Sequence, residues 1–148
     1  MKLDALDMQV LEILEKDSKL SIKQISKMVK KPITTIHNRI KKLELQGIIT
    51  QYTIKLNYEK LGRAISAYIL ITVKYLEDNR VSQSEIGNKV KNRKEVESVS
   101  VITGEKDIII KVRVASISQL NKLITNYLRN IEGIDKTETM IVLEEIKS

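Results

Sequence analysis

The stretch SKLSIKQISKMVKKPITTIHNRIKKL spans residues 18–43 and contains eight basic side chains but no carboxylate. Apolar residues recur within it at the spacing of amphipathic helices, which predicts two short helices that each bury one side. The outer surface then carries charge of one sign, and a phosphate backbone is the partner that such a surface favours. The apolar positions are Ile22, Ile25, Val29, Ile33, Ile36, Ile40 and Leu43, and the basic ones are Lys19, Lys23, Lys27, Lys30, Lys31, Arg39, Lys41 and Lys42.

Local signals place the ends of these helices and of one that precedes them. Asp4 suits the N-cap of the first helix, because its carboxylate accepts hydrogen bonds from free backbone N–H groups. Ser21 and Gln24 have the spacing of a capping box, which starts the second helix. Pro32 ends the following turn and begins a third helix, which runs up to a C-cap glycine, Gly47. Two helices joined by a tight turn result.

The third helix divides into a buried side and a polar side. Near its N-terminus, Thr34, Thr35 and Asn38 offer donors and acceptors for base edges, whereas Arg39, Lys41 and Lys42 further along suit phosphates. This arrangement predicts a recognition helix. The candidate DNA-binding residues, including those on the flanks of the helix and in the turn before it, are Lys31, Thr34, Thr35, His37, Asn38, Arg39, Lys41 and Lys42.

Residues 48–55, IITQYTIK, alternate in the manner of a β-strand, and we expect them to form a small wing. The N-terminal domain is therefore predicted to be a winged helix-turn-helix that spans residues 1–54. Residues 55–63 are predicted to form a hinge, since they contain Asn57 and Gly62.

Residues 64–148 predict the order strand, helix, strand, strand, helix, strand, which is that of a ferredoxin-like βαββαβ fold in the α+β class. Both helices should cover one side of an antiparallel sheet. The opposite side would expose Tyr68 and Leu70, so we expect a second copy of the chain to cover it in a homodimer. The predicted strands are 64–75, 96–103, 107–114 and 137–146, and the helices are 84–93 and one that Ser116 caps and Gly133 ends.

Composition argues against an enzyme. The 148 residues include no Cys and a single His, His37, which removes thiolate nucleophiles, structural zinc sites and the usual base of a serine triad. We therefore expect neither catalysis nor a metal or other cofactor.

Residues 1–60 carry 12 basic and 7 acidic groups, and residues 61–148 carry 14 basic and 12 acidic groups, so the net positive charge is concentrated in the first half. No apolar run approaches the ~18 residues of a membrane span and the start is unlike a signal peptide, which predicts a cytoplasmic protein.

Short motifs along nearly the whole chain resemble those of one family. Leu3-Asp4-x-x-Asp7-x-x-x-Leu11 is similar to an opening LDxxDxxIL, and Arg39-Ile40-x-x-Leu43-x-x-x-Gly47-Ile48-Ile49 to RIxxLxxxGvI. Leu61-Gly62 matches a linker LG, and Thr103-Gly104-Glu105-Lys106-Asp107 a tGxxD loop. Gly133-Ile134 and the segment from Thr139 to Lys147 resemble a closing pGV…TxIVLEEVK. In this order and length, the motifs identify the chain as a member of the Lrp/AsnC (feast/famine) family of transcription regulators.

The resemblance implies a winged helix-turn-helix followed by a RAM/ACT-like ferredoxin domain, which mediates dimers and often octamers. It also implies a small effector, typically an amino acid, bound near the glycine–aspartate loop between dimers. The candidate effector-binding residues are Gly104, Glu105, Lys106, Asp107 and Thr139. A plain structural hairpin is the alternative role for Gly104 and Asp107.

Two positions depart from the family pattern. Lys31-Pro32 stands where relatives usually have Leu-Ser, which removes the usual serine cap of the recognition helix. Lys106 replaces an aromatic or apolar residue before the loop aspartate, which bears on whether and how an effector binds.

We therefore predict a homo-oligomeric, sequence-specific DNA-binding transcriptional regulator that responds to an amino acid or similar effector. Two alternatives remain open from sequence: a DNA-packaging architectural protein with low sequence preference, and a metabolite-sensing regulatory subunit of an enzyme. The identity of the effector, the operator, the sign of regulation and the choice among dimer, tetramer and octamer do not follow from the sequence.

Overall fold

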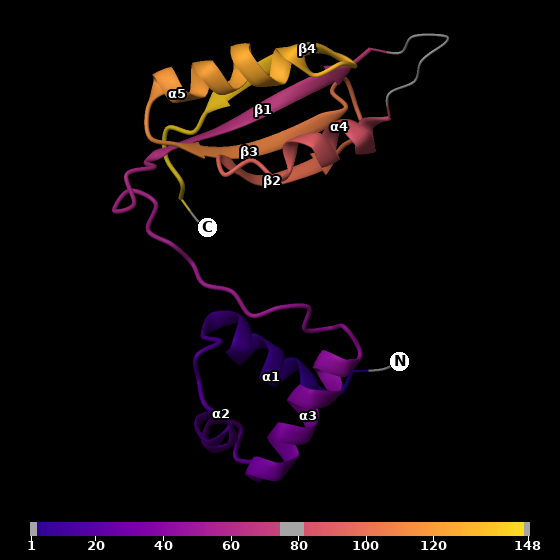
Figure 1. Cartoon of the computed structure of the whole chain (residues 1–148). Coiled ribbons are helices and arrows are strands. Elements are labelled where there is room, and N and C mark those ends of the chain that lie inside the picture. Colours follow the sequence, from indigo (N-terminus) through magenta and orange to yellow (C-terminus); the bar gives the residue numbers. More distant parts are fainter. Residues whose placement is uncertain (1–2, 75–81, 147–148) are drawn as a thin grey trace. The chain divides into compact units, whose positions relative to one another are not determined.

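The computed structural model describes residues 3–74 and 82–146, and the chain forms two compact units, Met1–Lys55 and Leu56–Ser148 (Figure 1). The N-terminal unit contains three helices, α1 (Ala5–Lys16), α2 (Ile22–Val29) and α3 (Ile33–Leu45). Val10 of α1, Ile25 of α2 and both Ile36 and Leu43 of α3 are fully buried where the three helices meet.

The predicted caps of the first two helices are confirmed. The Asp4 carboxylate accepts a hydrogen bond from the backbone N–H of Asp7, and the Asp7 carboxylate accepts one from the N–H of Asp4. Ser21 and Gln24 make the same reciprocal pair of bonds at the start of α2. Each box satisfies backbone donors that a helix leaves without partners inside itself.

The turn between α2 and α3 is held without a side-chain cap on α3. Pro32 is the N-cap residue of α3 and offers no side-chain acceptor, as expected from the departure at this position. Ser26, which is nearly buried, donates a hydrogen bond from its hydroxyl to the backbone oxygen of Lys31. Lys30 closes α2 with a positive φ of 53°, the only non-glycine residue in residues 3–74 and 82–146 with this backbone conformation.

Replacing Lys30 with glycine is expected to stabilise the N-terminal unit by about 0.5–1 kcal/mol, because the left-handed conformation strains a residue that has a Cβ atom. Replacing the neighbouring Lys31 with glycine provides the control. Its φ is not positive, so the substitution should cost stability instead. Urea unfolding of both variants compares them, and an equal loss in both would contradict the strain at Lys30.

Two expectations for this unit are wrong. Residues 48–55 form no strand, and the described residues of the N-terminal unit, from 3 to 55, include no other strand with which they could pair. The Tyr52 hydroxyl of this segment donates a hydrogen bond of 2.7 Å to the Glu44 carboxylate of α3. Desolvation, together with this contact, raises the pKa of Tyr52 to about 12. Ile33 was predicted on the buried side of α3, yet about half of its surface is exposed because it lies in the first turn, at the edge of the core.

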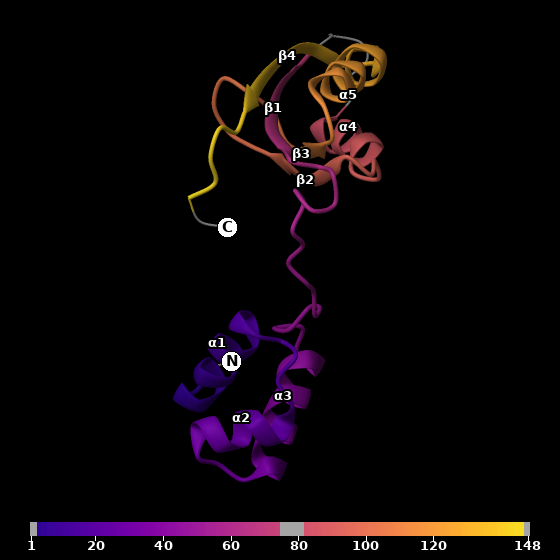
Figure 2. The same ribbon diagram turned by 90° about the vertical axis from the view of Figure 1, so that its left-hand side faces the viewer.

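The C-terminal unit confirms the predicted order of strands and helices. Its elements are β1 (Ile65–Val73), α4 (Gln83–Val90), β2 (Val96–Val101), β3 (Ile108–Val114), α5 (Ile117–Lys122) with its π-helical and 3₁₀ continuations (Leu123–Tyr127 and Leu128–Asn130), and β4 (Ile134–Ile141). The strands form one antiparallel sheet in the order β2-β3-β1-β4. Both helices cover the same side of it, and none of the described helices lies on the other side (Figure 2).

Alternation along the strands separates a buried face from an open one. On β1, Ala67, Ile69 and Ile71 are fully buried beneath the helices. Tyr68 and Leu70 point to the other face and are half-buried, as expected for the alternate positions of a strand. Tyr75, the last residue of the predicted strand 64–75, lies outside the described residues.

The last strand differs from its prediction at both ends. It begins at Ile134, earlier than the expected residue 137, because Ile134 pairs with Val73 of β1. It ends at Ile141, since the chain beyond it leaves the ladder after the Val142 N–H donates to the Ser66 carbonyl.

Candidate DNA-binding surface and effector loop

The polar side of α3 lies opposite its buried side. Thr34, Asn38 and Lys41 are separated from the buried Ile36 and Ile40 by roughly half a helical turn, and all three are exposed. These side chains lie on one continuous strip of the helix. The strip combines a hydroxyl and an amide, which can hydrogen-bond base edges, with an ammonium group that can contact phosphate.

The other predicted DNA-binding residues flank this strip. Thr35 and Lys42 are half-buried along one side of α3, and His37 is exposed on the other. Lys31 is exposed in the turn before the helix. The structure therefore brings seven of the eight candidates together on or beside α3, in positions from which a duplex can be reached.

Arg39, the eighth candidate, is engaged within the protein. Its Nη1 donates to Asp4 Oδ2 at 2.5 Å and to Asp7 Oδ1 at 3.0 Å. Asp7 is 1% exposed. The backbone N–H of Asp7, and after it the Arg39 guanidinium, lower the pKa of Asp4, while the hydrogen bonds that Arg39 donates to Asp7 and Asp4 raise the pKa of Arg39. These contacts join α3 to the start of α1, a role for Arg39 that the sequence did not predict.

The lysines of the basic stretch remain uncompensated. In residues 3–74 and 82–146, Lys19, Lys23, Lys27, Lys30, Lys31, Lys41 and Lys42 form no ion pair with a carboxylate, and all but the half-buried Lys42 are exposed. Their charges are available to an external anion. Such a concentration of free positive charge on one small unit favours a phosphate backbone.

In the C-terminal unit, Asp107 has partners within its own chain. Its Oδ2 accepts a hydrogen bond of 2.8 Å from the Val73 N–H, and its Oδ1 accepts one of 2.8 Å from the Gln83 side-chain amide. Its backbone N–H also donates to the Ile71 carbonyl. The carboxylate therefore joins the loop to the end of β1 and the start of α4, which is the structural role that the sequence left open.

The remaining predicted effector residues are divided by the sheet. Gly104 adopts a φ of +119°, which favours glycine, and Glu105 is exposed beside it. Lys106 forms an ion pair of 2.9 Å with Glu138, which lies opposite Leu70 on the open face. Thr139 lies opposite Ile69 and therefore points to the helix side of the sheet. A single chain thus does not gather the five residues into one pocket.

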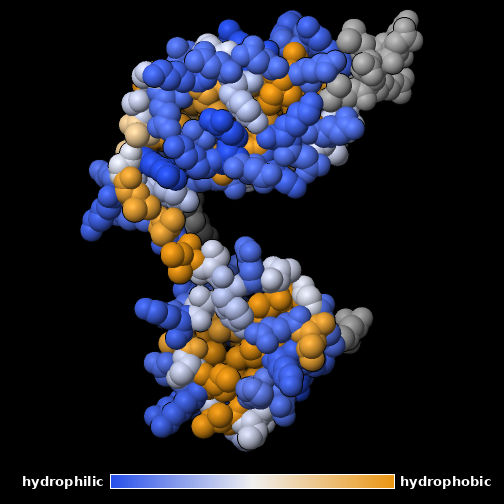
Figure 3. Space-filling view, viewed as in Figure 1, coloured by the Kyte–Doolittle hydropathy of each residue, from blue (hydrophilic) through white to orange (hydrophobic). Residues whose placement is uncertain are grey.

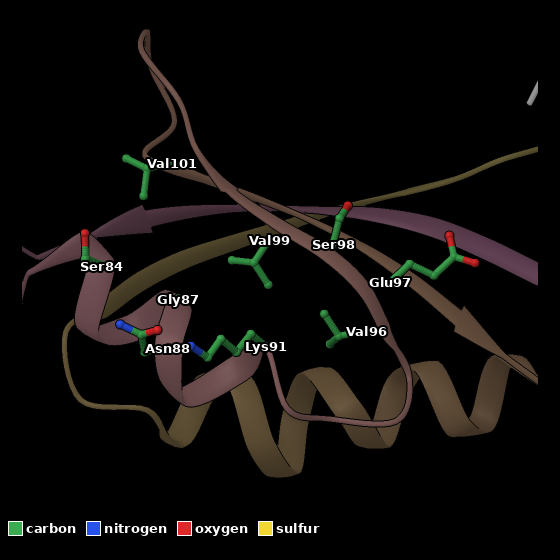
Figure 4. A pocket seen from close by; sticks show the side chains of 9 residues that line it. All are labelled: Ser84, Gly87, Asn88, Lys91, Val96, Glu97, Ser98, Val99 and Val101. Atoms are coloured by element: carbon green, nitrogen blue, oxygen red, sulfur yellow. The ribbon is translucent and has the colours of Figure 1, made fainter. Parts of the chain in front are cut away.

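A groove that the sequence did not predict lies between α4 and the edge strand β2 (Figure 4). It encloses about 430 Å³, has Val96 and Val99 along the strand, and is bordered by Asn88 and Lys91 from the helix. Gly87 has no side chain to narrow the groove, whereas a Cβ atom at this position would lie 3.4 Å from a Val99 methyl group. None of the predicted effector residues lines it.

Charged residues cross one end of the open face. Arg113 lies 2.8 Å from both Glu97 and Glu145, and Lys111 lies 2.9 Å from Glu145. These hydrogen bonds lower the pKa of Glu145 and raise that of Lys111. The Arg113 guanidinium also stacks 4.7 Å from the Tyr58 ring centre. The contacts fix the segments before β1 and after β4 against the sheet.

Comparison with known proteins agrees with this architecture. Residues 3–50 match the family model for winged helix-turn-helix DNA-binding domains, and residues 66–148 match the Lrp/AsnC ligand binding domain. The HTH-type transcriptional regulator FL11 of Pyrococcus furiosus is 38% identical over 142 residues, which are 96% of this chain and 90% of that protein. An uncharacterized HTH-type transcriptional regulator of Pyrococcus horikoshii is 40% identical over 147 residues, 99% of this chain and 95% of the relative.

Solved structures show the same fold. AsnC of E. coli superposes with a TM-score of 0.87 at 30% identity, over 100% of this chain and 97% of that one. A transcriptional regulator of Neisseria meningitidis, solved in complex with L-Met, superposes with a TM-score of 0.92 at 24% identity, over 99% and 94% of the two chains. Within the described residues, no helix is long and apolar enough to cross a membrane. The chain therefore belongs to the Lrp/AsnC family of DNA-binding transcriptional regulators.

Proposed function

We propose that two copies of this chain bind one two-fold symmetric DNA site, each placing α3 in a major groove. Thr34, Thr35 and Asn38 read base edges. Lys31, His37, Lys41 and Lys42 contact phosphates. The observation that carries this proposal is the polar strip of α3. It lies opposite the helix's buried side and within a set of lysines that no carboxylate in the described part of the chain neutralises.

The open face of the C-terminal sheet is the surface that we assign to the dimer. Tyr68, Leu70 and Ile109 are half-buried there, and Met140 is 46% exposed on the adjacent strand. The helix side of the same unit is covered mostly by hydrophilic residues (Figure 3). A second copy related by a two-fold axis would bury the apolar part of the open face against itself, and half-sites spaced by about one helical turn or a multiple of it would follow.

Changing Lys41 to glutamine is expected to reduce the salt dependence of binding by about one counterion, a change of roughly 0.9 in the slope of log K against log[salt], without altering the preferred sequence. Changing Asn38 to alanine should alter the preferred sequence instead. Titrations of labelled duplexes between 50 and 300 mM KCl, followed by footprinting, separate the two effects. Identical footprints for wild type and Asn38→Ala would remove Asn38 from the reading surface.

We further propose that the C-terminal unit binds an amino acid near the Gly104–Asp107 loop, in a site that is completed by another chain. The match to a ligand binding domain supports this, together with the way the single chain divides the predicted residues. The regulator from Neisseria that shares the fold was solved with L-Met.

A thermal-shift screen of the twenty amino acids tests the effector. A ligand that binds only the folded protein at 100 times its Kd stabilises it by about 2.7 kcal/mol, so one or a few amino acids should raise Tm by several degrees. The same screen with Gly104→Val serves as the control, since the substitution strains the loop. No shift with any amino acid would reject the amino-acid effector and leave DNA binding unaffected.

A further inference from the structure

The contacts of Arg39 differ in kind from those of its neighbours on α3. Its side chain is about 29% exposed and donates from one nitrogen to two carboxylates at the start of α1. Asn38 and Lys41 are exposed and have no such partners among the residues that the structure describes. The two carboxylates are themselves fixed, because Asp4 and Asp7 form the capping box that starts α1. Arg39 therefore joins the recognition helix to a rigid point on another helix.

This contact constrains α3 in a way that its apolar packing does not. Ile36, Ile40 and Leu43 hold α3 in the core by burial, which has little directional preference. A charged hydrogen bond depends on direction, and Nη1 of Arg39 donates to two carboxylates at once. The positions of Asp4 and Asp7 consequently add a directional restraint on the rotation of α3 about its own axis.

We propose that Arg39 is a positioning residue for sequence recognition: its bonds to Asp4 and Asp7 set the rotation at which α3 presents Thr34, Thr35 and Asn38 to the base edges. This inference rests on the proposed function, since it assumes that α3 reads DNA. Arg39 contributes to specificity without contacting DNA. Hydrogen bonds to base edges tolerate only small displacements, so a rotated helix loses its preferred sequence before it loses its general attraction to phosphates.

Asp7 provides the decisive variant. It is 1% exposed, so it cannot reach a duplex, and any change in sequence preference caused by Asp7→Asn must act through the protein. Asparagine keeps the shape of the side chain and an oxygen that can accept the Asp4 N–H bond. The substitution therefore spares the cap of α1 and weakens the hold on Arg39.

The experiment uses the full-length protein and two duplexes of equal length: one selected by the wild type from a random library, and one with the same bases shuffled. The Kd for each duplex is measured between 50 and 300 mM KCl for Arg39→Gln, Asp7→Asn and the double variant. Lys41→Gln serves as the phosphate-contact comparison, and Arg129→Gln, an exposed arginine of the C-terminal unit, controls for the loss of one charge. Circular dichroism establishes that each variant is folded at the assay temperature.

We expect Arg39→Gln and Asp7→Asn each to lower the ratio of selected to shuffled affinity about tenfold, the loss that one displaced base contact causes, with the salt slope unchanged. The double variant should lose no more than Arg39→Gln alone, since the contact that Asp7→Asn weakens is one of the two that Arg39→Gln removes. If the contact had only a structural role, the variants would have a lower Tm, but a folded variant would keep the wild-type ratio of selected to shuffled affinity. That result would overturn the proposal.

Arg39 would instead be a phosphate contact if Arg39→Gln reduced the salt slope as Lys41→Gln does while Asp7→Asn had no effect, and that result also overturns the proposal. If Arg39→Gln does not fold, Arg39→Lys and Asp7→Asn decide the question, because lysine keeps the charge but loses the planar fork. If the wild type enriches no sequence at all, the proposed function fails, and the inference fails with it.

Discussion

Replacing Leu70 with aspartate is expected to convert the protein to a monomer and to weaken its binding to a selected two-fold duplex by about 10²–10⁴-fold. Leu70 lies on β1 between two neighbours on the open face, Ile109 of β3 and Glu138 of β4. A carboxylate there would be buried without a partner when a second copy covers the face, and a two-fold axis places it in the interface twice.

The loss of DNA affinity follows from the loss of pairing. In a dimer, the second α3 binds its half-site as an intramolecular event at high effective concentration, and a monomer lacks that advantage. Analytical ultracentrifugation measures the mass, and titration of the selected duplex measures the affinity. Ser118→Asp adds the same charge on the helix side, at an exposed position of α5. It should change neither the mass nor the affinity for the duplex. A Leu70→Asp variant with the mass of the wild type would move the interface elsewhere.

Replacing Asp107 with alanine is expected to destabilise the C-terminal unit by about 1–3 kcal/mol without any ligand present. The Val73 N–H, which belongs to a residue 3% exposed, donates to the Asp107 carboxylate at 2.8 Å and would lose this acceptor. An unsatisfied buried donor costs free energy of that order. Asp107→Asn should cost less, because its amide oxygen can still accept one bond.

Urea unfolding of the full-length chain measures the effect. Glu105→Ala is the matched control in the same loop, because Glu105 is exposed and its loss should change the free energy of unfolding by about 0.5 kcal/mol or less. Full stability in Asp107→Ala, together with loss of every amino-acid thermal shift, would identify the carboxylate as a ligand contact instead of a loop anchor.

Local chemistry explains which parts of the fold could be predicted. The capping pairs Asp4–Asp7 and Ser21–Gln24 lie three residues apart, so they are visible in sequence, and both form. The alternation that buries Ala67, Ile69 and Ile71 is equally local. Because the order of such elements restricts the topology of a small sheet, the ferredoxin-like arrangement followed from it.

The sequence could not reveal contacts between residues that lie far apart in the chain. Arg39 was assigned to phosphate because its place on α3 suits one, and its partners lie 32 and 35 positions earlier in the chain. Residues 48–55 have the pattern of a strand, but a strand also needs a neighbour, which periodicity does not reveal. The N–H of Val73, on another strand, likewise donates to the Asp107 carboxylate, a contact that the sequence pattern does not reveal.

Selection from a library of random duplexes tests the central claim most directly, since that claim is sequence-specific recognition by paired recognition helices. The full-length wild type should enrich a two-fold symmetric motif whose half-sites are separated by about one helical turn or a multiple of it, and Asn38→Ala should enrich a different half-site. Retention of duplexes with no enriched sequence, by a protein that is folded and bound, would contradict the account.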